Sequence, residues 1–551
     1  GELRPPPRPG RDDDARLAPL RDDPRYFEGA ELGKAQKAAL GIKGLTGQNT
    51  ASFDPASTLV RPAMRIRYGE VRKRYGHPIL TDDVVAVPGF LAASDDRCLF
   101  GSLASELREL RDGGRDLRES ATYQSIVKKA CKYFAIAEDG RSLQIEWRRK
   151  PKGNGSPRAA IVEGKGELLR DKGHNCVVSM VLGASREITF WRESAEDSIN
   201  FRHENGTLML LGRDVLGRDW QHGQAAPASA EAAEDHIVVT IAGAAGEMHE
   251  DRVLGATPAK EPPKPCRDFE RGRCFYGEKC RFAHAALAPS VKAASMPDFS
   301  PTTVSVRPSM RIITVPMSEA GRYGRPVSHD DVIIVPDFFN EKEGWALYYQ
   351  LLKEMRESQA SGTRKAEWLS WHEGAHLLSQ NPTGSATYHQ VLARMRKYFS
   401  VPEENTGTRF NWYVDGSDWK PFHHDSAAFN PERAKTQNCT IGVSFGSCRE
   451  LGFRHAKTEQ LVYFPQTNGM LFFFGQDANI RWQHGVNALP ESEQDGKGRI
   501  SIILWGKCGL AVDEPGSPPL LTDESRGNKG KGKDKGKGKG KGKFGFNMHS
   551  R

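Results

Sequence analysis

Three side chains in the C-terminal half of the sequence have types and spacing that could hold a metal ion. His423 and Asp425 stand two residues apart in the segment NWYVDGSDWKPFHHD. Both side chains leave the same face if this segment is an extended strand. His484, in the segment RWQHGV, is the candidate third ligand. Two imidazoles and one carboxylate leave three positions open on Fe(II), which oxygenases use for a 2-oxo acid and O2.

Two polar side chains follow this set at the start of a predicted strand, RISIILW. Arg499 could pair with the remote carboxylate of a 2-oxo acid. Ser501 lies two residues later on the same face and could add a hydroxyl. His424, the neighbour of the first two ligands, points away from them on a strand and is predicted to be structural.

Over residues 304–510 the chain closely resembles the AlkB-type 2-oxoglutarate and Fe(II)-dependent dioxygenases. The resemblance rests on an ordered set of residues: Asn411, Tyr413, His423, Asp425, His484 and Arg499. It implies that Asn411 and Tyr413 help to hold 2-oxoglutarate, that His423, Asp425 and His484 bind iron, and that Arg499 grips the co-substrate. It also implies hydroxylation of N-methyl groups on DNA or RNA bases, with release of formaldehyde. The family usually has a second Arg six residues after the first, and here Trp505 occupies that position.

A second metal site is predicted between the two halves of the chain. Its four ligands have the spacing C-x7-C-x5-C-x3-H: Cys266, Cys274, Cys280 and His284. Three thiolates and one imidazole fill a tetrahedral Zn(II) shell with no open position, so this site is structural. About 20 residues cannot form a core, so metal binding would supply the folding energy.

The segment 266–284 resembles the CCCH zinc fingers, which typically bind single-stranded RNA. Its aromatic side chains alternate with Arg and Lys, and offer flat faces for base stacking beside cations for phosphate. One or two of them are also needed simply to pack on the metal site. The four candidate RNA-contacting residues are Phe269, Phe275, Tyr276 and Phe282.

An internal repeat organises the chain. Residues 61–90 return as 307–338, the segment SATY at 120–123 returns at 385–388, and WQHG at 220–223 returns at 482–485. In each copy, apolar residues at helical spacing come first and short β-branched and aromatic runs follow. The pattern predicts an α+β fold, and with the family resemblance it implies two tandem double-stranded β-helix, jelly-roll-like domains with flanking helices, joined by a linker that carries the zinc finger.

The first copy lacks the residues expected of an iron site. Glu146 and Arg148 replace Asn411 and Tyr413, His236 replaces Arg499, and the segment KGNGSPRAA has no H-x-D. His222 alone remains of the three ligands, and one imidazole cannot hold iron. The first copy is therefore predicted to be a pseudo-enzyme.

The second copy has 20 extra residues, within 358–382, before its SATY segment. This insert contains Trp368, Trp371 and His372, which could form a lid and stack on a flipped or unpaired base. Packing of both Trp side chains on the helix layer is an equally good interpretation.

Composition and charge set the remaining boundaries. No apolar run approaches the roughly 20 residues of a membrane span, and nine mostly scattered Cys fit a reducing compartment. We therefore expect an intracellular protein, nuclear or cytoplasmic, with no membrane partner; the sequence indicates no oligomeric state.

Residues 526–551 hold eight Lys and two Arg against one Asp, a balance of +9 that equals the net charge of the whole chain. This tail is expected to bind polyanions, or else only to aid solubility. The predicted organisation is 1–57 disordered, 58–247 degenerate AlkB-like domain, 248–265 linker, 266–284 zinc finger, 285–303 linker, 304–510 dioxygenase domain and 511–551 disordered tail.

These features favour Fe(II)- and 2-oxoglutarate-dependent demethylation of N-alkylated bases in nucleic acid, RNA before DNA, with the finger and tail supplying binding. Two alternatives stay open. The iron centre does not specify what it oxidises, so a protein side chain is a second candidate substrate. The third interpretation is a catalytically inactive RNA-binding scaffold.

Overall fold

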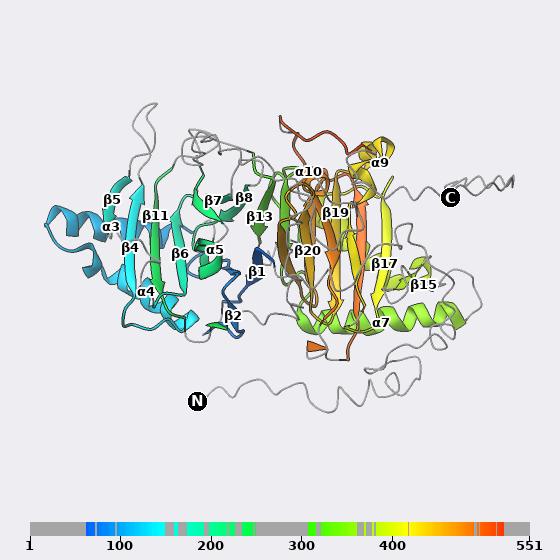
Figure 1. Ribbon diagram of the computed structural model, residues 1–551, viewed down its shortest axis with the longest axis horizontal. Helices are drawn as coiled ribbons and strands as arrows, with labels where there is room; N and C mark the ends of the chain where they lie inside the picture. Colours follow the sequence, from blue (N-terminus) through cyan, green and yellow to red (C-terminus); the bar gives the residue numbers. More distant parts are fainter. Residues whose placement is uncertain are drawn as a thin grey trace, which may run out of the picture.

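The computed structural model describes residues 62–249 and 307–522. Within these ranges it omits 72–73, 94–95, 149–158, 164–172, 192–197, 218–219, 226–233, 246–247, 316–320, 361–367, 371–376, 380–381, 417, 490–492, 495 and 514. The described part is a mixed α+β protein dominated by two large sheets (Figure 1). Within it, no helix combines the length and the apolar character needed to cross a membrane.

The first half contains strands, helices and one 3-10 turn in this order: β1 (Met64–Tyr68), β2 (Ile79–Leu80), β3 (Asp83–Val87), α3 (Cys98–Asp112), η3 (Leu117–Glu119), α4 (Ala121–Phe134), β4 (Ser142–Arg148), β5 (Ala159–Glu163), β6 (Cys176–Gly183), β7 (Arg186–Trp191), β8 (Ile199–His203), β9 (Leu208–Gly212), α5 (Arg213–Gly217), β10 (Gln221–Gln224), β11 (His236–Gly243) and β12 (Met248–His249).

The second half presents the equivalent elements in the same order, with additions: β13 (Met310–Thr314), β14 (Asp331–Val335), α7 (Glu341–Ala360), β15 (Trp368–Ser370), β16 (Leu377–Ser379), η7 (Pro382–Gly384), α8 (Ala386–Phe399), β17 (Gly407–Tyr413), β18 (Lys420–His423), η8 (Ser426–Ala428), α9 (Pro431–Thr436), β19 (Cys439–Gly446), β20 (Arg449–His455), β21 (Leu461–Gln466), β22 (Leu471–Gly475), α10 (Gln476–Arg481), β23 (Trp482–Val486) and β24 (Arg499–Gly506).

The second helix of the pair in each half begins with the same local arrangement. In the repeated SATY segment, the Ser side chain accepts a hydrogen bond from the backbone N–H of the Tyr three residues on, which caps α4 through Ser120 and α8 through Ser385. A glutamate of the preceding helix, Glu106 or Glu354, accepts hydrogen bonds from this Ser and from the Thr that follows. The motif therefore repeats because it joins two helices as well as starting one.

Both sheets run across the two halves. One sheet has the strand order β18-β23-β20-β21-β1-β3-β9-β6-β11-β4-β5, and the other has the order β10-β7-β8-β13-β14-β22-β19-β24-β17-β16-β15. The junctions are two parallel pairings, β1 with β21 and β8 with β13. Four strands of the second half thus extend the sheet of the first, and three strands of the first extend the sheet of the second. Figure 1 shows this continuity where the blue and green strands of the centre meet the orange ones.

Three groups of buried side chains hold these layers together. One lies between α3, α4 and the first half's sheet, and a second lies between α7, α8 and the second half's sheet. The third lies between the two sheets and draws on both halves, with Met64 and Phe201 in the same cluster as Phe453 and Phe474. The two predicted units therefore share their sheets and a central core.

Candidate metal centre

The three proposed ligands converge between the two sheets. β18 pairs with β23 so that His423 lies opposite His484. Strand β18 ends at His423, two residues before Asp425, which precedes η8. The backbone of Asp425 is nevertheless extended. The predicted strand is therefore shorter than the H-x-D argument assumed, but the side chains still meet.

The ligand atoms are close enough to share one ion. One ligand atom from each residue lies within 4.8 Å of the others. Nε2 of His484 is 3.7 Å from Oδ2 of Asp425, and Nε2 of His423 is 3.9 Å from Oδ1. Ligand atoms about 2.0 to 2.2 Å from one metal are separated by about 3 to 4 Å. The cluster therefore needs only small side-chain adjustments to close on an ion.

The tautomer of His423 suits metal binding. Its Nδ1 lies 2.8 Å from the carbonyl oxygen of Pro421, and a carbonyl can only accept a hydrogen bond. Nδ1 therefore carries the proton, and the lone pair is left on Nε2, which faces Asp425. His484 is held differently, because its ring packs against the rings of Phe453 and Phe474.

The protonation states of the three side chains also suit the binding of a metal cation. Burial lowers the pKa of His484 to about 4 and lowers the pKa of His423 well below its ordinary value. Burial alone would raise the pKa of Asp425, but His484 and Lys420 lower it below the usual range. Neutral imidazoles and an ionised carboxylate are the forms that bind metals.

Asp425 is turned toward the cavity by its surroundings. It occupies the N-cap position of η8, where Asp commonly bonds to the helix, yet its side chain makes no capping bond. Its Oδ2 instead accepts a hydrogen bond of 2.7 Å from Thr440 on β19. Asn479 of α10 grips the Asp425 backbone from both sides, because it accepts from the N–H and donates to the carbonyl. The Asn479 carbonyl oxygen also lies 2.6 Å from Nδ1 of His424, so His424 contacts α10.

The predicted co-substrate residues lie on the facing sheet. The pairing of β17 with β24 sets Asn411 opposite Ser501 and Tyr413 opposite Arg499. Arg499 is buried, donates from Nε to Ser444 Oγ at 2.7 Å, and lies over the Tyr413 ring at 4.9 Å. Within the described part of the chain, its Nη1 and the Oδ1 of Asn411 are buried atoms without a hydrogen-bond partner. A bound carboxylate could accept a hydrogen bond from Nη1 of Arg499, whereas Oδ1 of Asn411 needs a donor.

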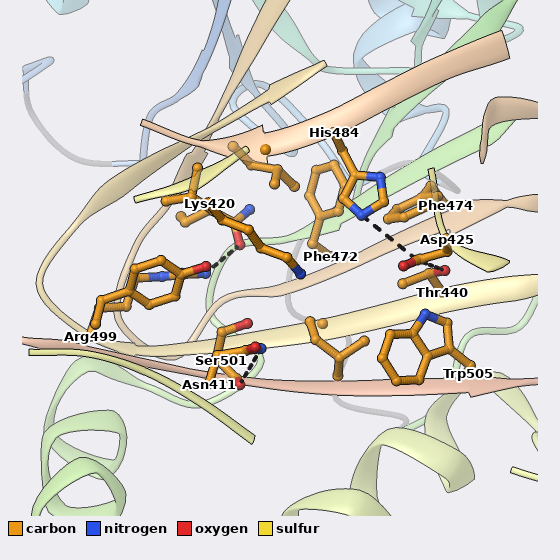
Figure 2. Close-up of a pocket in the computed structure, with 17 residues that line it drawn as sticks. Asn411, Lys420, Asp425, Thr440, Phe472, Phe474, His484, Arg499, Ser501 and Trp505 are labelled. Atoms are coloured by element: carbon orange, nitrogen blue, oxygen red, sulfur yellow. Dashed lines mark hydrogen bonds and ion pairs between the residues drawn. The ribbon is translucent and has the colours of Figure 1, made fainter. Parts of the chain in front are cut away.

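One cavity joins the two groups of residues (Figure 2). His484 and Asp425 lie at one end, and Arg499 lies at the other, with Asn411 and Ser501 along one wall. Its other lining residues are Tyr413, Lys420, Thr440, Gly442, Leu451, Gln466, Phe472, Phe474, Gly485, Val486, Ile503 and Trp505. The donor set at one end fits Fe(II), and the unpartnered Nη1 at the other fits the remote carboxylate of a 2-oxo acid.

Sequence reasoning missed several residues that build this site. Thr440, Asn479 and Ser444 position Asp425 and Arg499, and Lys420 points its side chain into the cavity. Thr440, Gly442 and Ser444 alternate along β19, so their shared face was a readable signal. Nothing in the sequence marks Lys420 or Asn479, because single polar residues beside a strand are common.

Other predicted residues lie elsewhere. The insert of the second half contributes β15 and β16, which extend the sheet next to β17, with Leu378 opposite Asn411. Trp368 begins β15, whereas Trp371 and His372 lie outside the described residues. The four zinc ligands (Cys266, Cys274, Cys280 and His284) and the four aromatic RNA candidates (Phe269, Phe275, Tyr276 and Phe282) also lie outside them.

A family model confirms the zinc finger. Residues 262–285 match the family described as zinc finger C-x8-C-x5-C-x3-H type (and similar). The first spacing in this chain is one residue shorter than in that description. The chain therefore carries a CCCH-type zinc finger between its two halves.

The likeness to whole proteins is partial. An uncharacterized protein, R406, of Acanthamoeba polyphaga mimivirus is 32% identical over 123 residues, which are 22% of this chain. The chain spans 59% of the length of that curated relative.

Similar solved structures include a Pseudomonas putida prolyl-4-hydroxylase, OsALKBH1, and an oxidoreductase of the 2OG-Fe(II) oxygenase family from Burkholderia pseudomallei. Their identities to this chain are 15%, 14% and 16%, and their TM-scores are 0.20, 0.21 and 0.20. They cover 29%, 34% and 32% of this chain, and this chain covers 86%, 100% and 84% of theirs. Likeness at this level assigns neither fold nor activity.

Proposed function

We propose that the second half of this protein is an Fe(II)- and 2-oxoglutarate-dependent dioxygenase of AlkB type, built on a double-stranded β-helix, that demethylates N-alkylated bases in nucleic acid, with RNA as the expected substrate. The single observation that carries the proposal is the convergence of His423, Asp425 and His484, of which Asp425 and His484 line one end of a cavity whose other end holds Arg499. When bound, ferrous iron and 2-oxoglutarate supply oxidation of an N-methyl group with O2, which yields succinate, CO2 and, after loss of the hydroxymethyl group, formaldehyde.

The residues of this chain have separate tasks in that reaction. His423, Asp425 and His484 would hold the metal on one face, and Thr440 keeps the Asp425 carboxylate directed at it. Arg499 would pair with the remote carboxylate of the co-substrate, and Ser444 and Tyr413 hold the guanidinium in place. Leu451, Phe472 and Phe474 line the cavity and exclude water from it.

The nucleic-acid substrate is supported by the CCCH zinc finger, a class of module that typically binds single-stranded RNA. Its position between the halves, together with the Lys-rich tail, would raise the local concentration of a polyanion without adding contacts at the metal. Such a protein would act in the nucleus or the cytoplasm.

The test is product analysis by mass spectrometry with the full chain, Fe(II), 2-oxoglutarate and a panel of N-methylated RNA and DNA strands. We expect formaldehyde and unmethylated base in equal amounts, and no product from Asp425→Ala. A matched control is Asp477→Ala, which changes a buried carboxylate of α10 that pairs with Arg307, outside the cavity. Succinate formation without loss of methyl groups would favour a protein side chain as substrate, and failure to bind Fe(II) would favour the scaffold.

A further inference from the structure

Lys420 is the first residue of β18 and lies three residues before His423. Only 6% of its surface is exposed, and it lines the same cavity as Asp425, His484 and Arg499. Figure 2 shows its side chain crossing the cavity wall, with the ammonium group between the Arg499 end and the Asp425 end. A lysine with so little contact with water usually has an anion as its partner.

The charges that line the cavity do not balance. Lys420 and Arg499 are its cations, whereas Asp425 is the one acidic residue among the described residues that line it. A ferrous ion would add two further positive charges at the Asp425 end. A dianion in the cavity would offset this excess.

The position of Lys420 also bears on Trp505, which stands where related enzymes have a second Arg. Trp505 lies on β24, and the guanidinium of Arg409 on the adjacent β17 covers its ring at 5.3 Å. Its indole N–H contributes to the low pKa of Asp425. Lys420 comes from β18, in the opposite sheet, and so reaches the metal end from the other wall.

We propose that Lys420 is a further co-substrate-binding residue, whose ammonium group pairs with the metal-proximal carboxylate of the 2-oxo acid while Arg499 pairs with the remote carboxylate. This inference rests on the proposed function of the same site. It assigns the two ends of the co-substrate to cations from two different sheets, and it accounts for the absence of a second Arg on β24.

The electrostatics of the lysine agree with its position. Burial, followed by Arg409, lowers the pKa of Lys420 to about 7, and Asp425 opposes that shift more strongly than Arg499 adds to it. Lys420 in turn contributes to the pKa shifts of Asp425, His423 and His484. Its ammonium group is therefore coupled to the metal end of the cavity.

The experiment compares two 2-oxo acids of equal length. 2-Oxoglutarate has both carboxylates, whereas 2-oxopentanoate has a methyl group in place of the remote one. The full chain is loaded anaerobically with Fe(II), and each acid is titrated while the visible charge-transfer band of the ternary complex is recorded. Fe(II) affinity without a 2-oxo acid and the melting temperature are measured for every variant.

We expect Lys420→Met to weaken binding of both acids by a similar factor, about tenfold to 100-fold, because both keep the metal-proximal carboxylate. Arg499→Met should weaken 2-oxoglutarate and leave 2-oxopentanoate nearly unchanged. Lys420→Arg keeps the charge and should recover most of the affinity lost in Lys420→Met. Lys435→Met, on the exposed side of α9, is the matched control and should bind both acids as the unmodified protein does.

Unchanged binding of both acids by Lys420→Met would overturn the inference, and so would a loss confined to 2-oxoglutarate, which would move the lysine to the remote carboxylate. If Lys420→Met does not fold, Lys420→Gln is measured in its place against the same expectations. Absence of the band in the unmodified protein with 2-oxoglutarate is a different result, because it would remove the proposed function itself.

Discussion

Equivalent positions of the two halves carry different chemistry. In the second half, β24 begins with Arg499 opposite Tyr413, and in the first half, β11 begins with His236 opposite Arg148. Both starting residues also lie opposite a glycine with positive φ, Gly446 or Gly183. An added Cβ at either glycine would lie within 2.6 Å of a backbone carbonyl oxygen. The backbone at these paired positions is thus the same in the two halves, whereas the side chains that start β11 and β24 differ.

The same exchange occurs one strand away. Gln466 accepts a hydrogen bond from Arg499 in the second half, and the position equivalent to Gln466 in the first half is His203. In place of an arginine and its acceptor, the first half has two buried histidines. Burial lowers their pKa values, to about 4 for His203 and about 3 for His236, so they are neutral at physiological pH. At the position of Arg499 the first half therefore has a neutral imidazole, while its arginine, Arg148, takes the position of Tyr413.

The junction between the halves, in contrast, is repeated on both sides. Arg65 of β1 pairs with Glu450 at 2.6 Å, and the equivalent Arg311 of β13 pairs with the equivalent Glu187 at 2.9 Å. Each pair links one half to the other. Shared residues therefore join and cap elements in both repeats, whereas most residues that would touch a ligand differ; the exception is the histidine at positions 222 and 484.

The largest expected effect comes from replacing the histidine that both halves share, His484 in the second half and His222 in the first. We expect His484→Ala to weaken Fe(II) binding and turnover by more than about 100-fold, because even loss of an outer residue that orients a ligand costs about 10- to 100-fold. His222→Ala should change neither by more than about twofold, since its ring stacks on Phe190 and it belongs to no group of three potential metal ligands among the described residues. Calorimetric titration with Fe(II) measures the metal affinity of both variants. An equal loss in the two variants would show that the first half also binds metal.

The junction offers the next largest effect. Glu450→Ala should lower the free energy of unfolding by about 2 to 4 kcal/mol, because it leaves the buried Arg65 without its closest partner and also removes a contact with Arg67. Glu187→Ala should cost less, about 1 to 2 kcal/mol, because Glu187 is more exposed and Asp330 and Asp331 lie closer to Arg311, at 3.5 and 3.4 Å, than Asp82 and Asp83 lie to Arg65, at 3.9 and 4.0 Å. Urea denaturation measures the free energy of unfolding of both variants, provided that their m-values match that of the unmodified protein. The reverse order of the two losses would contradict the geometry.

Acid should act through buried histidines of both halves, since the pKa values of His203 and His236 in the first half and of His423 and His484 in the second are all lowered. The pKa of His203 is depressed in the folded protein, so the unfolded chain binds more protons between about pH 6.5 and pH 4. Its contribution to stability is therefore present above pH 6.5 and is lost as pH falls through that window. His203→Gln, which installs the residue of the second half, should flatten the decline. Denaturation midpoints at pH 7 and pH 5 test this, and parallel curves for the variant and the unmodified protein would refute it.

The smallest effect should be equal in the two halves. Ser120→Ala and Ser385→Ala each remove a helix N-cap and a hydroxyl that bonds to a glutamate of the neighbouring helix. Each is expected to cost about 1 kcal/mol. Thermal unfolding measures the losses, and a severalfold difference between them would mean that the shared motif has different roles in the two halves.

Local features of the fold could be predicted from the sequence. Apolar residues at helical spacing predict two stripes, Trp345, Tyr348, Leu352 and Met355 along α7 and Phe100, Leu103, Leu107 and Leu110 along α3. All face the core, although the first member of each stripe is only partly buried. The strands predicted from the runs CTIGVSF and RISIILWG are β19 and β24. These are regular elements whose periodicity depends only on near neighbours.

Features that depend on distant pairings could not be predicted. The exchange of strands at β1 and β21 joins residues about 400 positions apart, and no periodicity reports such a partner. Asp425 reaches the cavity from beyond the end of β18, since Asn479 and Thr440 hold it there. Residue types and order were enough to identify the three candidate ligands, but not the residues that orient them.

The parallel junctions have a consequence for any shortened form of this protein. Removal of residues 1–306 would strip β21 of β1 and β13 of β8, and would leave two rows of backbone N–H and C=O groups facing water. Exposed edges of this kind recruit other strands. The second half in isolation should therefore self-associate or aggregate, because in the full chain the first half covers those edges from within the same polypeptide.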